Sequence, residues 1–359
     1  MNQGRERPTI GLTMGDVAGI GPEVLARAWA DPRLHLLCRP VVIGDPGVLG
    51  KALELVHSSA TVQVIDRPED AAPALERVPV LCPEEACGLG DLSSLPAGQV
   101  DARAGRAAYE FLIRAIDLAL TGRIDAIVTL PLNKESLHRS GIEHPGHTEI
   151  LAQRCGVAEH AMMLYLAADA GEEHAVPTFS ARPGLGVVHV TLHVALRQVF
   201  TLLSTEAVVA KIRLADRAMR PLTEGRAPRI AVSSLNPHAG ENGLFGDEEI
   251  RIIGPAVAIA KEAGFDVRGP LPNDTLYLQA LAGAYDAVVA MYHDQGHIAL
   301  KTAGFRRAVN VTLGLPIVRT SVAHGTSFDI AWKGIADPSS LIEATRVAAR
   351  IVAGRQQGL

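Results

Sequence analysis

The sequence has few cysteines, and their spacing matches no familiar structural motif. Its 359 residues include four of them, with neither a CxxC pair nor the density of a small secreted scaffold: Cys38, Cys82, Cys87 and Cys155. Such usage is typical of proteins from reducing compartments. We therefore expect all four thiols to be reduced and to have no chemical role.

The sequence also lacks long apolar runs and an excess of positive charge. No run approaches the roughly 18 apolar residues of a membrane span, and residues 1–8 contain no apolar targeting core. The formal net charge is −5 and the basic residues are dispersed, which is not the pattern of a nucleic-acid-binding surface. These absences predict a soluble, cytoplasmic protein with no membrane or nucleic-acid partner.

Short apolar runs are present, and five of them stop at a group of polar side chains. An apolar run without alternation is typical of a strand covered on both faces, and the helical patterns between the runs favour a mostly parallel sheet. Open α/β sheets bind ligands at the carboxyl ends of their strands, so we expect functional residues there. The runs occupy residues 9–13, 124–130, 187–192, 229–235 and 286–291.

Length and composition allow two domains. A chain of 359 residues, 48% of them hydrophobic, can build two cores that share a cleft. The longest stretch without a helical or strand pattern, Asp169 to Gly184, predicts a surface excursion before the strand that leads to His193.

Three histidines, His193, His238 and His293, each follow a predicted strand. A single histidine is more often a hydrogen-bonded structural residue than a ligand. Three of them at one edge of a sheet can bind a divalent metal and leave coordination positions open for substrate oxygens. The joint pattern therefore indicates a candidate metal site.

Other polar groups are candidates for binding anions. In residues 19–23, Gly21 precedes a proline, which is typical of the first turn of a helix. This segment either binds an anion at the start of the helix or is an ordinary tight turn. No GxGxxG follows the first strand, so a conventional Rossmann site is not indicated. A helical pattern begins at His147 and Thr148. These residues either contact an anionic ligand or only cap the helix. Further donors for a carboxylate or phosphate are Lys301, Asn310 and Arg319.

Six motifs together resemble the 4-hydroxythreonine-4-phosphate dehydrogenase (PdxA) family over nearly the whole chain. They are GDVAGIGPE at 15–23, PLNK at 131–134, GHTE at 146–149, NPHAGE at 236–241, YHDQG at 292–296 and NVTLGLPIVRTS at 310–321. The segment HGTSFDIAWKGIADP at 324–338 resembles the adenosine-binding loop of isopropylmalate and isocitrate dehydrogenases.

The resemblance implies a fold of two α/β/α domains with a cleft between them, like isopropylmalate and isocitrate dehydrogenases. Residues 1–130 plus 308–359 are then the first domain, with the adenosine-binding loop. Residues 131–307 form the second, with the metal ligands and the dimer contacts. The implied cofactor-binding residues are His324, Gly325, Asp329, Ile330 and Gly21.

The resemblance also implies an activity: NAD- or NADP-dependent oxidation of a secondary alcohol beta to a carboxylate, followed by loss of carbon dioxide, as in pyridoxine biosynthesis. A divalent ion (Zn, Mg, Mn or Co) is implied at His193, His238 and His293, in active sites shared across a homodimer. The implied substrate-binding residues are His147, Thr148, Lys301, Asn310 and Arg319. Candidates for moving protons are Lys301, Asp294 and Asp274.

One departure from the family pattern leaves the substrate open. After the His-Asp-Gln-Gly motif, where the biosynthetic enzymes have an apolar residue, this chain has His297, which we add to the candidate substrate-binding residues. This variant resembles a branch with D-threonate and D-erythronate 4-phosphate dehydrogenases, and also a cis-dihydrodiol dehydrogenase of an aromatic dicarboxylate. The substrate is thus 4-phosphohydroxythreonine or one of these alternatives.

Two alternatives lie outside the dehydrogenases. A metal-dependent hydrolase of a small phosphorylated molecule would use the same histidines, but it needs no adenosine loop. A non-catalytic sugar-phosphate-binding protein would not need three metal-capable histidines.

Overall fold

The computed structural model describes residues 7–168, 184–304 and 307–358, and the predicted excursion of Asp169 to Gly184 lies outside them except for Gly184. The chain divides into two compact units. Unit 1 comprises 1–158 and 315–353, and unit 2 comprises 159–314 and 354–359. Residues 131–158 thus belong to the first unit, and residues 308–314 to the second.

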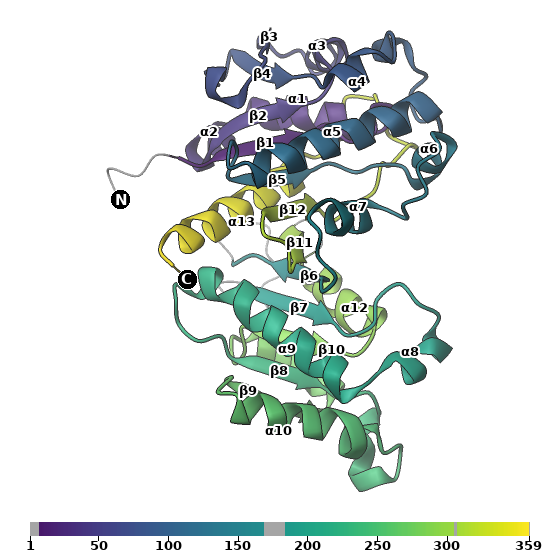
Figure 1. Cartoon of the computed structure of the whole chain (residues 1–359), viewed down its shortest axis with the longest axis vertical. Coiled ribbons are helices and arrows are strands. Elements are labelled where there is room, and N and C mark those ends of the chain that lie inside the picture. Colours follow the sequence, from purple (N-terminus) through teal and green to yellow (C-terminus); the bar gives the residue numbers. More distant parts are fainter. Residues whose placement is uncertain (1–6, 169–183, 305–306, 359) are drawn as a thin grey trace. The chain divides into compact units, whose positions relative to one another are not determined.

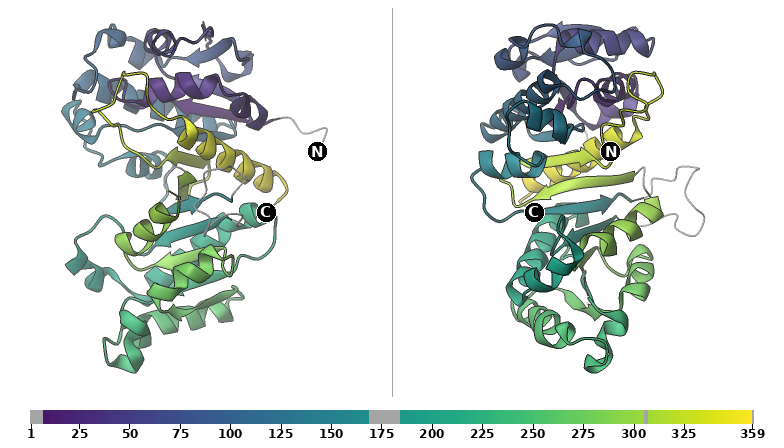
Figure 2. Two further views of the ribbon diagram at one scale, coloured as in Figure 1. Left: turned by 180° about the vertical axis from the view of Figure 1, so that it is seen from behind. Right: turned by 90° about the vertical axis from the view of Figure 1, so that its right-hand side faces the viewer.

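Unit 1 contains a parallel sheet of six strands. Their order is β3 (Thr61–Val64), β4 (Arg77–Leu81), β2 (Arg39–Ile43), β1 (Thr9–Thr13), β5 (Ala126–Thr129) and β12 (Val318–Val322). Helix α5 (Ala102–Leu120) packs against β1, β2 and β5 on one face, and α1 (Gly21–Trp29) and α13 (Ser339–Gln356) cover the other (Figures 1 and 2). Two covered faces explain why β5 is buried at every position.

Unit 2 contains a sheet region of six strands, one of them reversed. The order is β11 (Ala308–Leu313), β6 (Ala161–Leu166), β7 (Leu185–His189), β10 (Ala287–Ala290), β8 (Ile230–Ser233) and β9 (Val267–Leu271). β6 is antiparallel to both neighbours, and the other pairs are parallel. Helices α9 (Thr205–Met219) and α12 (His293–Gly304) both contact β7 and β10 and lie on opposite faces of this sheet (Figure 2, right).

All five predicted strands are present, as β1, β5, β7, β8 and β10. The α/β fold class and the mostly parallel pairing are confirmed. The remaining α-helices are α2 (Pro32–Leu37), α3 (Pro46–Leu55), α4 (Glu84–Cys87), α6 (Lys134–Arg139), α7 (His147–Arg154), α8 (Leu196–Leu202), α10 (Gly254–Glu262) and α11 (Asn273–Leu281). Short helical turns are η1 (Pro68–Asp70), η2 (Leu92–Ser94), η4 (Arg220–Thr223), η5 (Pro237–Gly243) and η6 (Glu249–Ile253).

Side-chain caps fix where several of these helices begin. Asp45 accepts a hydrogen bond from the Val48 amide at 2.8 Å, and Asn133 accepts one from the Ser136 amide at 2.9 Å. Each cap satisfies an amide that has no partner within the helix. Among the helices of the described residues, none combines the length and the apolar character needed to cross a membrane.

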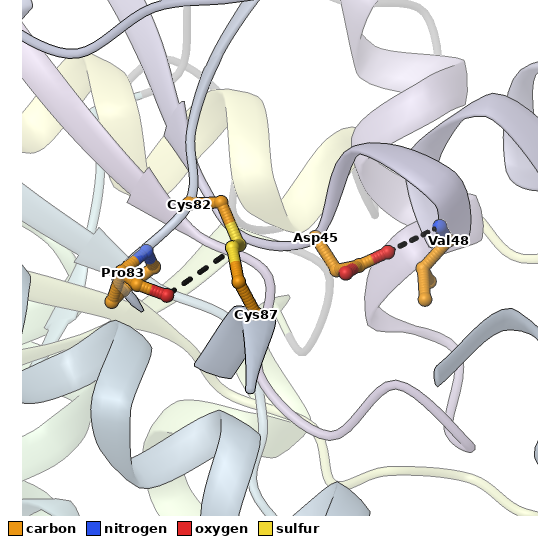
Figure 3. Close-up of a disulfide and its surroundings, with 5 residues drawn as sticks. All are labelled: Asp45, Val48, Cys82, Pro83 and Cys87. Carbon is orange, nitrogen blue, oxygen red and sulfur yellow. Dashed lines mark hydrogen bonds between the residues drawn. A yellow bond between two sulfur atoms is a disulfide. The ribbon is translucent and has the colours of Figure 1, made fainter. Parts of the chain in front are cut away.

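The expectation of four reduced cysteines is wrong for two of them. Cys82 and Cys87 form a disulfide (Figure 3), whereas Cys38 and Cys155 are free thiols. The short helix α4 turns the chain back directly after β4, so the two Cα atoms are 6.5 Å apart, which a disulfide can span. Sequence reasoning missed the pair because this proximity depends on that turn.

Candidate functional site

Neighbouring strands of unit 2 bring four histidines together. β7 ends at His189, which lies opposite Ala290 at the end of the parallel strand β10. Beyond β7, the amide of Thr191 donates to the Met291 carbonyl at 3.1 Å, so the chain leading to His193 stays beside the chain leading to His293. The ring centroids of His193 and His293 are 5.8 Å apart. The strand-end argument thus correctly predicted that these two histidines would meet.

Asp294 orients His293. Its Oδ1 lies 2.7 Å from His293 Nδ1, so a neutral His293 ring that donates to this carboxylate keeps the lone pair on Nε2 available. A carboxylate that receives the other ring proton is the usual companion of a metal-binding histidine. The donor set of His193 and His293 therefore fits a divalent ion.

Gln295 fixes the start of α12. Its side-chain oxygen accepts from the Met291 amide at 2.6 Å, and its side-chain nitrogen donates to the Ser234 carbonyl at 2.7 Å. One buried amide therefore ties the end of β10 to the end of β8. Sequence reasoning missed this role, although Gln295 lies inside the YHDQG motif.

His297 and His189 form a buried pair beside this site. His297 Nδ1 lies 3.2 Å from His189 Nε2, and the His297 ring stacks on His293 with 3.9 Å between centroids. Burial, followed by the neighbouring histidines, lowers the pKa of His189 to about 3. Burial, His293 and the charge of Lys301 lower the pKa of His297 to about 4. Sequence reasoning missed His189, and the available signal was a polar residue inside an apolar run.

His238 lies in η5, directly after β8. Its side chain is 63% exposed, and Nδ1 lies 3.5 Å from Glu241 Oε1. Four residues of this loop that are not glycine have positive φ, a conformation that concentrates at functional sites: His238, Ala239, Glu241 and Asn242. Within the described residues of a single chain, no three His, Cys, Asp or Glu side chains form a group suited to a metal. The complete set of His193, His238 and His293 stays a prediction.

Glu249 holds the loop that carries His238. Its Oε1 accepts from the amides of Leu235 and Asn236 at 2.7 and 2.8 Å. Its Oε2 accepts from the Asn236 side chain at 2.9 Å. The chain after β8 is therefore fixed just before it reaches His238.

In unit 1, the buried guanidinium of Arg319 lies near the half-buried ring of His147. Arg319 lies on β12, is 4% exposed, and donates from Nη2 to Thr129 Oγ1 at 2.5 Å. Burial lowers the pKa of Arg319 to about 9. Burial also lowers the pKa of His147 well below its ordinary value, and the charge of Arg319 lowers it further. A positive charge held here beside a neutral imidazole suits a phosphate or carboxylate.

The predicted cofactor residues lie together in unit 1. The Ile20 amide donates to the Thr326 carbonyl at 3.1 Å, and Trp332 Nε1 donates to the Val17 carbonyl at 3.0 Å. The 324–338 segment, with His324, Gly325, Asp329 and Ile330, therefore packs against the loop before α1. A Cβ on Gly21 would lie 2.2 Å from the Met14 carbonyl oxygen. This crowding explains the glycine by packing, with or without an anion.

Asp16, in the same loop, is a residue that sequence reasoning did not single out. It is fully buried, Oδ1 accepts from the Ala18 amide at 2.9 Å, and Oδ2 has no hydrogen-bond partner. Burial raises the pKa of this carboxyl to about 6.

The other predicted residues occupy separate elements. Asp274 is exposed in the first turn of α11, and Lys301 lies in the last turn of α12, near His297. Asn310 is partly buried within β11. Thr148 is the second residue of α7. Their catalytic and binding roles stay predictions.

Comparison with known proteins supports the resemblance seen in the motifs. The sequence profile of the family described as "Pyridoxal phosphate biosynthetic protein PdxA" matches residues 36–348. The D-threonate 4-phosphate dehydrogenase of Pectobacterium atrosepticum is 44% identical over 343 residues, which cover 95% of this chain and 98% of that protein.

Two solved structures extend the comparison. The 4-hydroxythreonine-4-phosphate dehydrogenase of Klebsiella pneumoniae is 43% identical with a TM-score of 0.82, covering 96% of this chain and 98% of that chain. A terephthalate 1,2-cis-dihydrodiol dehydrogenase of Burkholderia xenovorans is 28% identical with a TM-score of 0.62, again covering 96% and 98%. The chain therefore belongs to the PdxA family of dehydrogenases.

Proposed function

We propose that this protein oxidises a phosphorylated four-carbon 3-hydroxy acid with NAD or NADP, and that the resulting 3-oxo acid loses carbon dioxide to give a phosphorylated ketone. The observation that carries the proposal is the pair of His193 and His293 at the ends of β7 and β10, with His293 oriented by Asp294. Family membership supplies the dehydrogenase chemistry.

The histidines are the proposed metal ligands. His193 and His293, with His238, would hold a Zn, Mg, Mn or Co ion, which when bound lowers the pKa of a coordinated hydroxyl and polarises the ketone that forms. Lys301, close to His297, is the proposed acid–base group, with Asp294 and Asp274 as the alternatives. The 324–338 segment is proposed to hold the adenosine of the cofactor, and the nicotinamide accepts the hydride.

Arg319 and His147 are proposed to bind an anionic group of the substrate, together with Thr148, Lys301 and Asn310. A buried guanidinium forms strong, directional hydrogen bonds with phosphate or carboxylate. Fixing the substrate at its charged groups would orient the alcohol for hydride transfer, so losing those contacts would lower turnover as well as affinity.

Two substrates fit this proposal. 4-Phosphohydroxythreonine is the substrate named for the Klebsiella relative, and D-threonate 4-phosphate is the one named for the Pectobacterium relative. The two relatives are 43% and 44% identical to this chain, so overall identity does not choose between them. His297, a polar residue packed on His293, favours the second.

We also propose a homodimer with shared sites. Apolar side chains that are at least half exposed lie close in sequence to two of the predicted metal ligands. They are Leu196 and Phe200, after His193, and Leu244 and Phe245, after His238. Helix α8, which carries the first two, projects from the rest of unit 2 (Figure 1). Apolar side chains in such positions favour a protein partner. A second copy is the simplest one, because a two-fold axis uses the same surface twice.

A substrate screen tests the proposal. Reduced nicotinamide would be followed by absorbance with 4-phosphohydroxythreonine, D-threonate 4-phosphate, D-erythronate 4-phosphate and their unphosphorylated forms. We expect each phosphate ester to have a much higher kcat/KM than its free alcohol. Preference for an unphosphorylated aromatic cis-dihydrodiol would contradict the phosphate assignment. Release of phosphate without reduction of the cofactor would identify a hydrolase instead.

A further inference from the structure

Two side chains of α1 hold the far end of the 324–338 segment. Glu23 Oε1 accepts a hydrogen bond from the Ala336 amide at 2.6 Å, and the Arg27 guanidinium donates to the Gly334 carbonyl. Glu23 and Arg27 lie one helical turn apart, with 3.8 Å between Arg27 Nε and Glu23 Oε1. One charge pair on α1 therefore satisfies a backbone donor and a backbone acceptor of the segment.

Regular secondary structure does not supply these contacts. Residues 323–338 contain neither a helix nor a strand, so their backbone groups need partners from other parts of the chain. The first part of the segment is held by the loop before α1, through the contacts of Thr326 and Trp332. The Ala336 amide and the Gly334 carbonyl have their partners on α1 itself.

Glu23 is a fully buried carboxyl that is only partly satisfied. It is 0% exposed, and Oε2 has no hydrogen-bond partner. Burial of a carboxylate is costly, and an apolar side chain of similar size often stabilises a buried position at least as well. Stability alone therefore does not explain a glutamate here. The contact with the segment does, because an apolar side chain offers no acceptor to the Ala336 amide.

We propose that Glu23, together with Arg27, is a positioning residue that holds the 324–338 segment in the conformation that binds the adenosine half of the cofactor. This assignment rests on the proposed function. If the segment adopts that conformation in only about one molecule in ten, the apparent Kd of the cofactor rises about tenfold. Once the cofactor is bound, the segment is in place, and the proposed reacting groups lie in other elements. The signature is a higher KM for the cofactor with an unchanged kcat.

Calorimetry on the full-length protein measures the effect without turnover, with NADH and NADPH as the probes. We expect Glu23→Leu and Arg27→Met to weaken dinucleotide binding about tenfold, the effect of one hydrogen bond. Glu23→Gln, which keeps an acceptor for the Ala336 amide, should stay close to wild type. Arg106→Met is the matched control and should bind as wild type does, because Arg106 forms the same i,i+4 pair with the buried Glu110 on another helix, α5.

Steady-state kinetics separate positioning from a general structural effect. With the best substrate of the screen, Glu23→Leu should raise the KM for the cofactor about tenfold and leave kcat and the KM for the acid unchanged. A smaller fraction of folded protein would instead lower kcat and change neither KM. If Glu23→Leu does not fold, Arg27→Met decides the question, since the Arg27 side chain is 38% exposed and its replacement is tolerated more easily.

The outcomes of the two measurements are distinct. Dinucleotide binding as tight as in wild type, in Arg27→Met and in folded Glu23→Leu, would overturn the proposal. If wild type binds a dinucleotide but turns over no acid of the screen, the proposed reaction fails, while the binding data still decide what Glu23 does. A wild type that binds neither dinucleotide overturns both.

Discussion

Replacing Arg319 by methionine should make the protein more stable and much less active. The guanidinium is 4% exposed, and burial lowers its pKa from its ordinary value to about 9. A shift of this size corresponds to a cost on the order of 5 kcal/mol for keeping the charge inside the protein. The lost hydrogen bond to Thr129 offsets about 1 to 3 kcal/mol of that gain. The net stabilisation is then about 2 to 4 kcal/mol, as for other buried charges replaced by apolar side chains of similar size.

The same substitution removes a proposed contact with an anionic group of the substrate. Losing one partner of a buried charge pair costs about 2 to 5 kcal/mol, so kcat/KM should fall by about 30-fold to several thousand-fold. Urea denaturation without ligand and steady-state kinetics measure the two effects. Arg67→Met, at an exposed ion pair with Asp70, is the matched control and should change neither. An Arg319→Met protein with near-normal kcat/KM, or with lower stability than wild type, would refute this account of the site.

Three further predictions concern the metal, the dimer and the buried carboxyl. Complete removal of divalent ions should abolish turnover, and His193→Ala or His293→Ala should lower kcat at least 100-fold; full activity in protein verified as metal-free would exclude the metal site. Mixing inactive His238→Ala and His293→Ala proteins should restore up to about a quarter of wild-type activity. About half of the dimers are then mixed, and each mixed dimer has one intact site out of two. No recovery after verified subunit exchange would place both ligands in one subunit. Burial raises the pKa of Asp16 in the folded protein to about 6. Between about pH 4 and pH 6, Asp16 is therefore protonated in the folded protein and ionised in the unfolded chain. The free energy of unfolding should therefore fall by about 3 kcal/mol as pH rises through that range. Urea denaturation at several pH values should show this fall in wild type but not in Asp16→Asn. The same pH dependence of stability in both proteins would contradict the prediction.

The parts of the site that depend on local pattern were predictable. His193 and His293 follow apolar runs, and the carboxyl ends of parallel strands meet, so their proximity followed from the sequence. The resemblance to the PdxA family was likewise visible in six motifs. Both results rest on information that lies within short segments of the chain.

The parts that depend on packing were not predictable. The apolar run of β6 carries no sign of its direction, which is set by its neighbours β11 and β7. His189 looks like one more residue of a buried strand until α12 brings His297 against it. The burial of Asp16 and the pairing of Cys82 with Cys87 likewise arise only when distant or reversed segments come together.

The division of the chain has a consequence for synthesis on the ribosome. Unit 1 uses residues from both ends of the chain, and β12 pairs with β5 only after residues 318–322 have been made. Until then, β5 is an open edge, the kind of strand that invites pairing with other chains. Residues 159–314, by contrast, emerge as one continuous stretch. The strands of the second unit can therefore pair before the first unit is complete. The first unit can fold fully only after β12 and α13 have been synthesised. Shortening the carboxyl terminus is therefore expected to destabilise the unit that contains the residues synthesised earliest.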